Sequence, residues 1–167
     1  MAEFVLKNIV NQKGLQDEFY IDSAATSGYN EMAHEGMYGE TKEILREMNI
    51  PFTEHFSRQI RKDDYDKFDY ILAMEQKNIP DILRIVGEDK QNKVFRLLDF
   101  TESPRDIADP WYYGNFDKTY YDISYFCCLK GSIQHASYNI EKSANNHSQN
   151  KTYQKPEHKT FLNLIHC

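Results

Sequence analysis

Residues Asp109, Pro110, Trp111, Tyr112 and Tyr113 place one carboxyl group beside a proline and three aromatic rings. Apolar surface next to a carboxyl removes water from it, which disfavours the charged form and raises the pKa. Such an acid can hold a proton near neutral pH and give it to a leaving group. The rings can also form a slot for a flat aromatic substrate. The same residue order is more often a turn that leads into a packed surface, so the surrounding elements must decide.

Helix-like and strand-like patterns alternate along the first part of the chain. Residues 68–74 form a near-continuous apolar run, which is typical of a strand buried on both faces of a parallel sheet. Alternation of this kind predicts an α/β fold with a parallel sheet. We expect strands at 18–24, 68–74 and 93–100, and helices at 4–14, 41–48, 76–86 and 116–128.

The last segment, residues 129–167, differs from the rest in composition. It holds five Lys and two acidic residues, so it carries +3 of a chain whose net charge is −6. Little in it is periodic apart from a short apolar patch at 161–165. We therefore expect an α/β domain over 1–128 and a divergent, poorly ordered tail over 129–167.

Composition excludes several classes of protein. A net charge of −6 argues against a nucleic-acid binder, which usually carries a basic face. No apolar run approaches the roughly 20 residues that a membrane span needs, and the start of the chain has no signal-peptide pattern. Cys127, Cys128 and Cys167 give neither a disulfide framework nor zinc-site spacing. A cytoplasmic protein without a metal or other cofactor is the expected class.

Several short segments, taken in order, resemble the low-molecular-weight protein tyrosine phosphatases, especially bacterial ones. The resemblance covers about residues 1–123. No single segment is specific for the family, but the order of the segments and their separations are specific. The segments are Met1-Ala2-Glu3-Phe4-Val5, Ile21 to Ser27, His55 to Gln59, Phe68 to Met74, Leu97 to Phe100, and Asp109 to Tyr112 with Asn115-Phe116-Asp117.

This resemblance implies a three-layer fold, in which helices flank both faces of a four-stranded parallel sheet. It also implies hydrolysis of phosphotyrosine, in a protein or a small aryl phosphate, through a cysteinyl-phosphate intermediate. A Cys-x5-Arg loop of the family supplies the nucleophile and the phosphate cradle. By the same resemblance, Asp109 is the general acid, and Trp111 and Tyr112 flank the substrate ring.

The chain departs from the family at that loop. In the family the loop comes immediately before the segment that here begins at Met1, and the strand leading into it lies in the middle of the sheet. Ile133 and Gln134 stand six residues after Cys127 and Cys128, so these cysteines form no Cys-x5-Arg motif. We therefore expect a truncated, catalytically inactive chain that lacks the central strand.

Other residues match family positions with structural roles. His55 and Arg58 correspond to a hydrogen-bond network, and Ser23 to a serine that supports the catalytic loop. A solvated His and a surface Arg are the alternatives for His55 and Arg58, whereas for Ser23 we expect an ordinary strand-end turn, because the catalytic loop is absent. Cys127 and Cys128 are either a redox pair or, more simply, residues of a helix with at least one side chain buried.

Two other functions stay open from the sequence. The chain can be a non-catalytic interaction module that keeps the aromatic loop without its nucleophile. It can also be a relative of the arsenate reductases, although an acid beside an aromatic slot suits an aryl phosphate better than arsenate.

Overall fold

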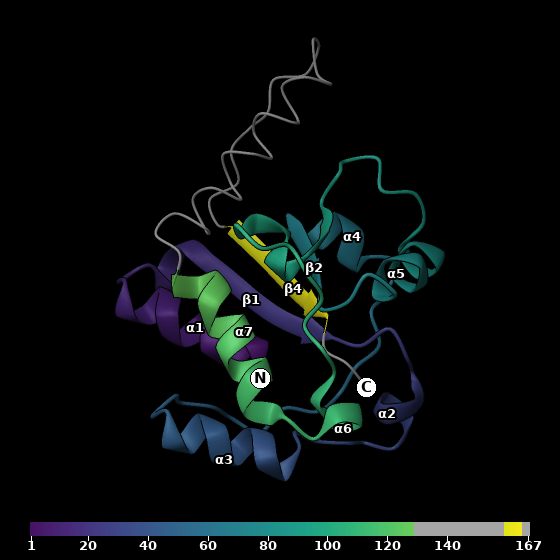
Figure 1. The fold of residues 1–167 in the computed structure, drawn as a ribbon. Helices are drawn as coiled ribbons and strands as arrows, with labels where there is room; N and C mark the ends of the chain where they lie inside the picture. The colour runs from purple at the N-terminus through teal and green to yellow at the C-terminus, as the bar shows by residue number, and fades with distance from the viewer. Residues whose placement is uncertain (129–158, 165–167) are drawn as a thin grey trace.

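A parallel four-stranded sheet organises the protein, whose computed structural model describes residues 1–128 and 159–164 (Figure 1). The strands follow the order β1-β4-β2-β3, and all neighbouring pairs are parallel. The three-layer α/β architecture is therefore the one predicted from the sequence. The strands are β1 (Phe19–Ala24), β2 (Tyr70–Ala73), β3 (Val94–Arg96) and β4 (Lys159–Leu164).

Helices cover both faces of this sheet (Figure 1). Alternate residues of β2 point to opposite faces, so Tyr70 and Leu72 join one apolar cluster and Ile71 and Ala73 join the other. The first cluster is closed by α1 (Ala2–Gln12), α3 (Gly39–Glu47) and α7 (Phe116–Cys128), and the second by α4 (Asp64–Lys67) and α5 (Asn78–Val86). The remaining elements are α2 (Tyr29–Met32), α6 (Pro110–Tyr113) and two 3-10 turns, η1 (Gln16–Glu18) and η2 (Leu97–Phe100).

Local sequence explains where α1 begins and ends. Glu3 lies in its first turn, where a negative charge complements the helix dipole. Phe4, Val5 and Val10 are buried on one face, and Gly14 follows the helix with a φ of 69°, a left-handed conformation that suits glycine. This helix presents its N-terminus at the carboxyl edge of the sheet.

The predicted third strand is shorter than its sequence suggests. β3 ends at Arg96, and η2 takes over the apolar residues that we expected to extend it. Asp99 explains the difference, because its carboxylate accepts hydrogen bonds from the backbone N and the Nε of Arg96, each at 2.9 Å. These local bonds favour a turn over continuation of the strand.

The middle of the sheet differs from the expectation of a missing strand. β4 lies between β1 and β2 and pairs with both, so Phe161 is opposite Ile21 on one side and Tyr70 on the other. The predicted poorly ordered tail therefore includes a strand at 159–164. Residues 129–158 and 165–167 lie outside the described residues, and for them that expectation stays a prediction.

Specific contacts hold β4 in this position. Phe161 is 2% exposed and stacks on Tyr70 at a centroid distance of 4.6 Å and on Phe19 at 5.6 Å. Thr160 accepts a hydrogen bond from Asp69 N at 2.8 Å and lies 2.9 Å from the carboxylate of Asp69. Without β4, the facing edges of β1 and β2 would expose unpaired backbone groups. Pairing of these groups explains why the short apolar segment is stable between the two strands.

Candidate functional site

The Asp109 loop folds as the short helix α6 with a defined start and stop. Asp109 is the N-cap, and its Oδ1 accepts a hydrogen bond from Trp111 N at 3.0 Å. Pro110 occupies the first turn, where its missing N–H costs little. Gly114 ends the helix in the left-handed conformation, with a φ of 65°. The side chain of Asp109 is thereby fixed, and the residue is only 4% exposed.

The aromatic residues of this loop lie mostly in solvent. Trp111 and Tyr112 are 62% and 70% exposed. One face of the Trp111 ring stacks on Tyr38 at a centroid distance of 5.1 Å and an angle of 17°. Lys77 lies over the ring of Tyr112 at 5.7 Å. The loop therefore presents an aromatic rim beside the buried Asp109, as the sequence interpretation requires, while the substrate-binding role of these rings stays a prediction.

A cavity of about 90 Å³ opens beside this rim. It lies at the carboxyl edge of the sheet, between Ser23 at the end of β1, the start of α1 and the Asp109 loop. In open α/β sheets this edge is the usual place for a ligand. The structure brings Asp109, Ser23 and His55 together around one cavity, although they are far apart in the sequence.

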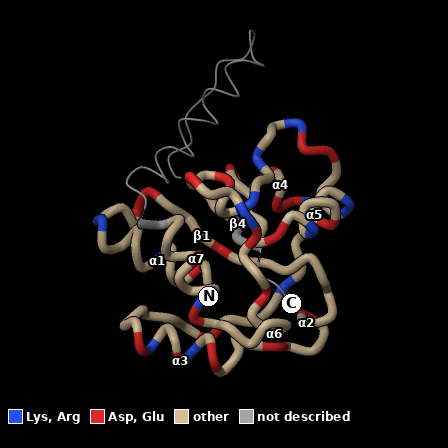
Figure 2. The backbone as a smooth tube through the Cα atoms, in the orientation of Figure 1, with Lys and Arg blue, Asp and Glu red and all other residues tan. Residues whose placement is uncertain are grey.

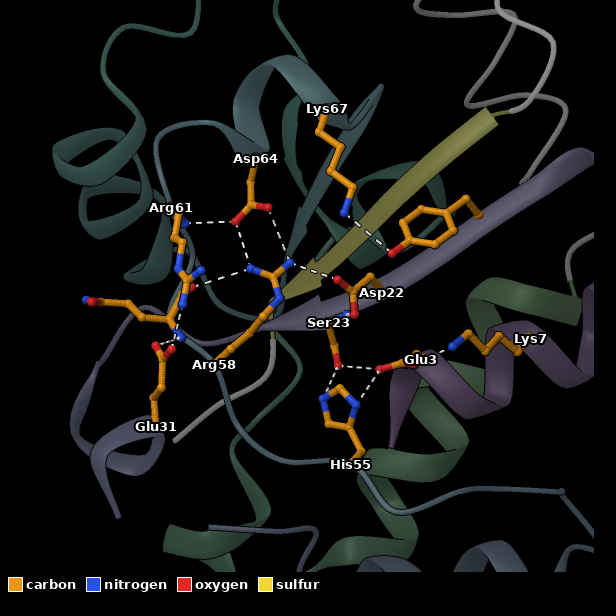
Figure 3. A network of polar contacts seen from close by, with 12 residues as sticks. Glu3, Lys7, Asp22, Ser23, Glu31, His55, Arg58, Arg61, Asp64 and Lys67 are labelled. Atoms are coloured by element: carbon orange, nitrogen blue, oxygen red, sulfur yellow. Dashed lines mark hydrogen bonds and ion pairs between the residues drawn. The ribbon is translucent and has the colours of Figure 1, made fainter. Parts of the chain in front are cut away.

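Ser23, His55 and Glu3 form a hydrogen-bonded group on one wall of the cavity (Figure 3). Ser23 Oγ donates to Glu3 Oε2 at 2.5 Å, so its lone pairs remain to accept from His55 Nε2 at 3.1 Å. Glu3 Oε1 also pairs with Lys7 Nζ at 2.5 Å. His55 therefore lies in a hydrogen-bond network with Ser23, whereas a role of Ser23 in supporting a catalytic loop stays untested, and Glu3 is a member that sequence reasoning missed. The position of Glu3 near the start of the predicted first helix was the sequence feature that could have indicated it.

Arg58 belongs to a second polar group, behind the end of β1 (Figure 3). Its guanidinium is 2.8 Å from Asp22 and 2.8 Å from Asp64. Burial alone would lower the pKa of Arg58, but the hydrogen bonds that it donates to Asp64 and Asp22 outweigh burial and raise the pKa above its usual value. Arg58 does not line the cavity, and its ion pairs join Asp22 of β1 to Asp64 at the start of α4.

Glu31 links α2 to the segment that follows Arg58. Its carboxylate accepts from Gln59 N at 2.7 Å and from Arg61 at 2.8 Å. The bond from the Gln59 backbone is the largest cause that lowers the pKa of Glu31. Tyr29 and Met32, which α2 carries, are 72% and 85% exposed.

The described part of the chain gives no cysteine or metal site. Cys127 and Cys128 lie at the end of α7, but their side chains and Cys167 lie outside the described residues. Across residues 1–128 and 159–164, no group of three His, Cys, Asp or Glu is placed to hold a metal ion. In the same residues no helix is long and apolar enough to cross a bilayer.

Comparison with known proteins connects this geometry to one family. The family model of low molecular weight phosphotyrosine protein phosphatase matches residues 1–143. The match extends beyond residue 123, where the resemblance between short segments ended, and reaches past α7.

Individual relatives support the match. The low molecular weight protein-tyrosine-phosphatase YfkJ of Bacillus subtilis is 37% identical over 139 residues, which cover 80% of this chain and 86% of that protein. The human low molecular weight phosphotyrosine protein phosphatase is 33% identical, with 77% of this chain and 82% of that protein covered.

Solved structures agree with the sequence comparison. The crystal structure of YfkJ superimposes with a TM-score of 0.71 at 32% identity, covering 85% of this chain and 86% of that one. A Streptococcus pyogenes low molecular weight protein tyrosine phosphatase superimposes with a TM-score of 0.64 at 30% identity, covering 75% and 77%. The chain belongs to the low molecular weight phosphotyrosine protein phosphatase family.

Proposed function

We propose that this chain has the scaffold of a phosphotyrosine phosphatase but does not itself hydrolyse phosphomonoesters. In that scaffold, Asp109 is the general acid that protonates a leaving phenolate, and Trp111 and Tyr112 flank the substrate ring. The burial of Asp109 and the exposure of the two rings beside the cavity support these roles.

The charge of the cavity wall carries the proposal of inactivity. Glu3, Glu35 and Asp109 line the cavity, whereas no Lys or Arg of residues 1–128 and 159–164 does. A phosphate dianion needs charge-assisted donors such as a bidentate Arg, and carboxylates repel it. The sequence supports the same conclusion, since neither Cys127 nor Cys128 is followed six residues later by Arg.

The size of the rate acceleration that Asp109 could provide agrees with the proposed inactivity. General acid catalysis by one side chain contributes about 10²–10⁴-fold. Enzymes accelerate their reactions by about 10⁶–10¹⁷-fold. Asp109 alone therefore leaves most of the barrier in place, because among the described residues of the cavity wall no Cys, Lys or Arg accompanies it.

The test is hydrolysis of p-nitrophenyl phosphate by the purified 167-residue chain, with its intact mass verified. We expect no vanadate-sensitive hydrolysis above the buffer rate, and the same rate for Asp109→Asn. Vanadate-sensitive turnover that falls with Asp109→Asn would overturn the proposal, because it would require a functional phosphate cradle in these residues.

A further inference from the structure

The outer edge of β1 is paired at one end only. β1 is an end strand of the sheet, with β4 on its inner side (Figure 1). Just after β1, Ala25 N donates to Arg58 O and Ala25 O accepts from Ile60 N, each at 2.8 Å, in a parallel bridge. Nearer its N-terminus this second segment leaves the edge, because Phe56 bridges Gly36 instead. The parallel partner therefore does not continue along β1 toward the start of that strand.

The open part of this edge presents the backbone of Ile21. Alternate residues of a strand point their N–H and C=O to the same side, so Ile21 points them outward, as Ala25 does. Ser23 lies between the two, and its N–H is bonded to Asp22 Oδ1 at 2.9 Å. Among residues 1–128 and 159–164, the outward N–H and C=O of Ile21 have no hydrogen-bond partner. β1 also has no Lys or Pro to block pairing, and Figure 2 shows it mostly without charge.

A groove lies beside these backbone groups. Its volume is about 380 Å³, and its walls include Phe19, Tyr20 and Ile21 of β1, Val10 of α1, and Pro51. The side chains of Phe19 and Ile21 point into the apolar cluster on the α1 face of the sheet. Tyr20 points to the other face and is 46% exposed. A strand added in this groove would therefore place alternate side chains against Val10 and Pro51, and the side chains between them beside Tyr20.

The charge on the Tyr20 face favours a carboxylate at one position. The Nζ of Lys67 lies 4.9 Å from the centre of the Tyr20 ring and 3.4 Å from its hydroxyl (Figure 3). Lys67 is exposed and forms no ion pair in the part of the chain that the structure describes. Lys7, which lines the groove on the other face, is already ion-paired. Asp22 is paired with Arg58, so the position opposite Asp22 favours a neutral side chain.

We propose that the open edge of β1 binds an extended peptide segment of another protein as an added parallel strand. The segment has apolar residues opposite Phe19 and Ile21 and a carboxylate opposite Tyr20. Main-chain hydrogen bonds give such strand addition its affinity, and alternate side chains give it specificity. The bridge at Ala25 supplies the pattern: Ile21 N donates to the residue before its partner, and Ile21 O accepts from the residue after it. This binding is separate from the Asp109 cavity and from hydrolysis.

The probe is the peptide acetyl-Thr-Val-Glu-Val-Thr-methylamide, titrated into the full chain and followed by backbone amide chemical shifts. Its second Val is designed to lie opposite Ile21 and its Glu opposite Tyr20. We expect the Ile21 amide to shift and its hydrogen exchange to slow. Backbone N-methylation of the last Thr removes the N–H that Ile21 O accepts and should weaken binding about tenfold. N-methylation of the second Val is the matched control, because that N–H points away from β1. Equal affinities of the two methylated peptides would overturn the proposal.

Two variants of the chain locate the carboxylate. Replacing the Glu of the probe by Gln should weaken binding about threefold, as expected for an exposed ion pair. Lys67→Met should abolish this difference, whereas Lys90→Met, before β3 at the opposite edge of the sheet, should retain it. A difference that persists in Lys67→Met would contradict the assigned position. Shifts of the Ile21 amide that depend on protein concentration without the probe would assign the edge to a second copy of the chain and overturn the choice of partner.

Discussion

The middle of the sheet and the cavity at its carboxyl edge differ in the contacts that the described residues provide. In the middle, β4 pairs with both neighbours and buries Phe161 between two aromatic rings. At the cavity, Asp109 lies beside the aromatic rim, and the described lining residues include Glu3 and Glu35 but no Lys or Arg. Both regions border β1.

This difference shows that a fold and a phosphate site have different requirements. A strand position needs paired backbone groups and an apolar side chain of suitable size, and many short segments provide them. A phosphate site needs a particular nucleophile and particular donors in a fixed geometry. Many sequences can therefore fill a strand position, whereas few can build a phosphate site.

Removing the aromatic ring of β4 should have the largest effect. We expect Phe161→Ala to lower the free energy of unfolding by about 3–5 kcal/mol, because it leaves a cavity between Phe19 and Tyr70. Urea unfolding followed by circular dichroism measures the loss. Tyr29→Ala is the control, since Tyr29 is 72% exposed, and its cost should stay within about 0.5 kcal/mol. Equal costs would show that β4 contributes little to the sheet.

The hydroxyl of Thr160 should contribute less than the ring beside it. Thr160→Val keeps the shape but removes the Oγ1 acceptor of Asp69 N at 2.8 Å, while the Thr160 carbonyl still accepts from that N–H at 3.0 Å, so the cost should be about 0.5–1.5 kcal/mol. Thr160→Ser retains the hydroxyl and should be closer to the parent in the same urea experiment. If serine and valine cost the same, the hydrogen bond to Asp69 is not what holds this register.

On the cavity side, Asp109→Ala should cost about 0.5–2 kcal/mol, because it removes the N-cap of α6. Asp109→Asn retains a capping oxygen and should cost less. The chain has one Trp, so Trp111 fluorescence reports directly on this loop. A cost above that of Phe161→Ala would reverse the comparison between sheet and cavity.

A titration at high pH should give the smallest effect, on the α4 side of the sheet. Burial raises the pKa of Tyr65 from 10.0 to about 12; a hydrogen bond from Gln91 lowers it and the Asp89 carboxylate raises it. The folded state therefore keeps the phenol proton that the unfolded chain releases. This stability is fully present below pH 10 and is lost as the pH rises toward 12.

The measurement is the free energy of unfolding from pH 9 to 12, compared with Tyr65→Phe. The variant has no phenol to titrate, so its stability should fall less steeply over that interval. Parallel curves would mean that the environment of Tyr65 does not favour its neutral form.

Much of the fold could be predicted from patterns that are local. The apolar run at 68–74 predicted a strand buried on both faces, and β2 indeed contributes alternate residues to two clusters. The helix over 116–128 and the turn at Asp109 and Pro110 were also apparent, because capping and helical periodicity act within a few residues. β3 was predicted too long because the bond from Arg96 to Asp99 competes with the strand.

The sequence by itself determined the family motifs, the alternation of helices and strands, and the position of Asp109 beside an aromatic loop. Only the tertiary structure decided that residues 159–164 fill the middle of the sheet and that Glu3 joins Ser23 and His55. The physical reason is range. Capping and periodicity are read over a few residues, whereas a strand's place and a cavity's charge depend on groups that only the folded chain brings together.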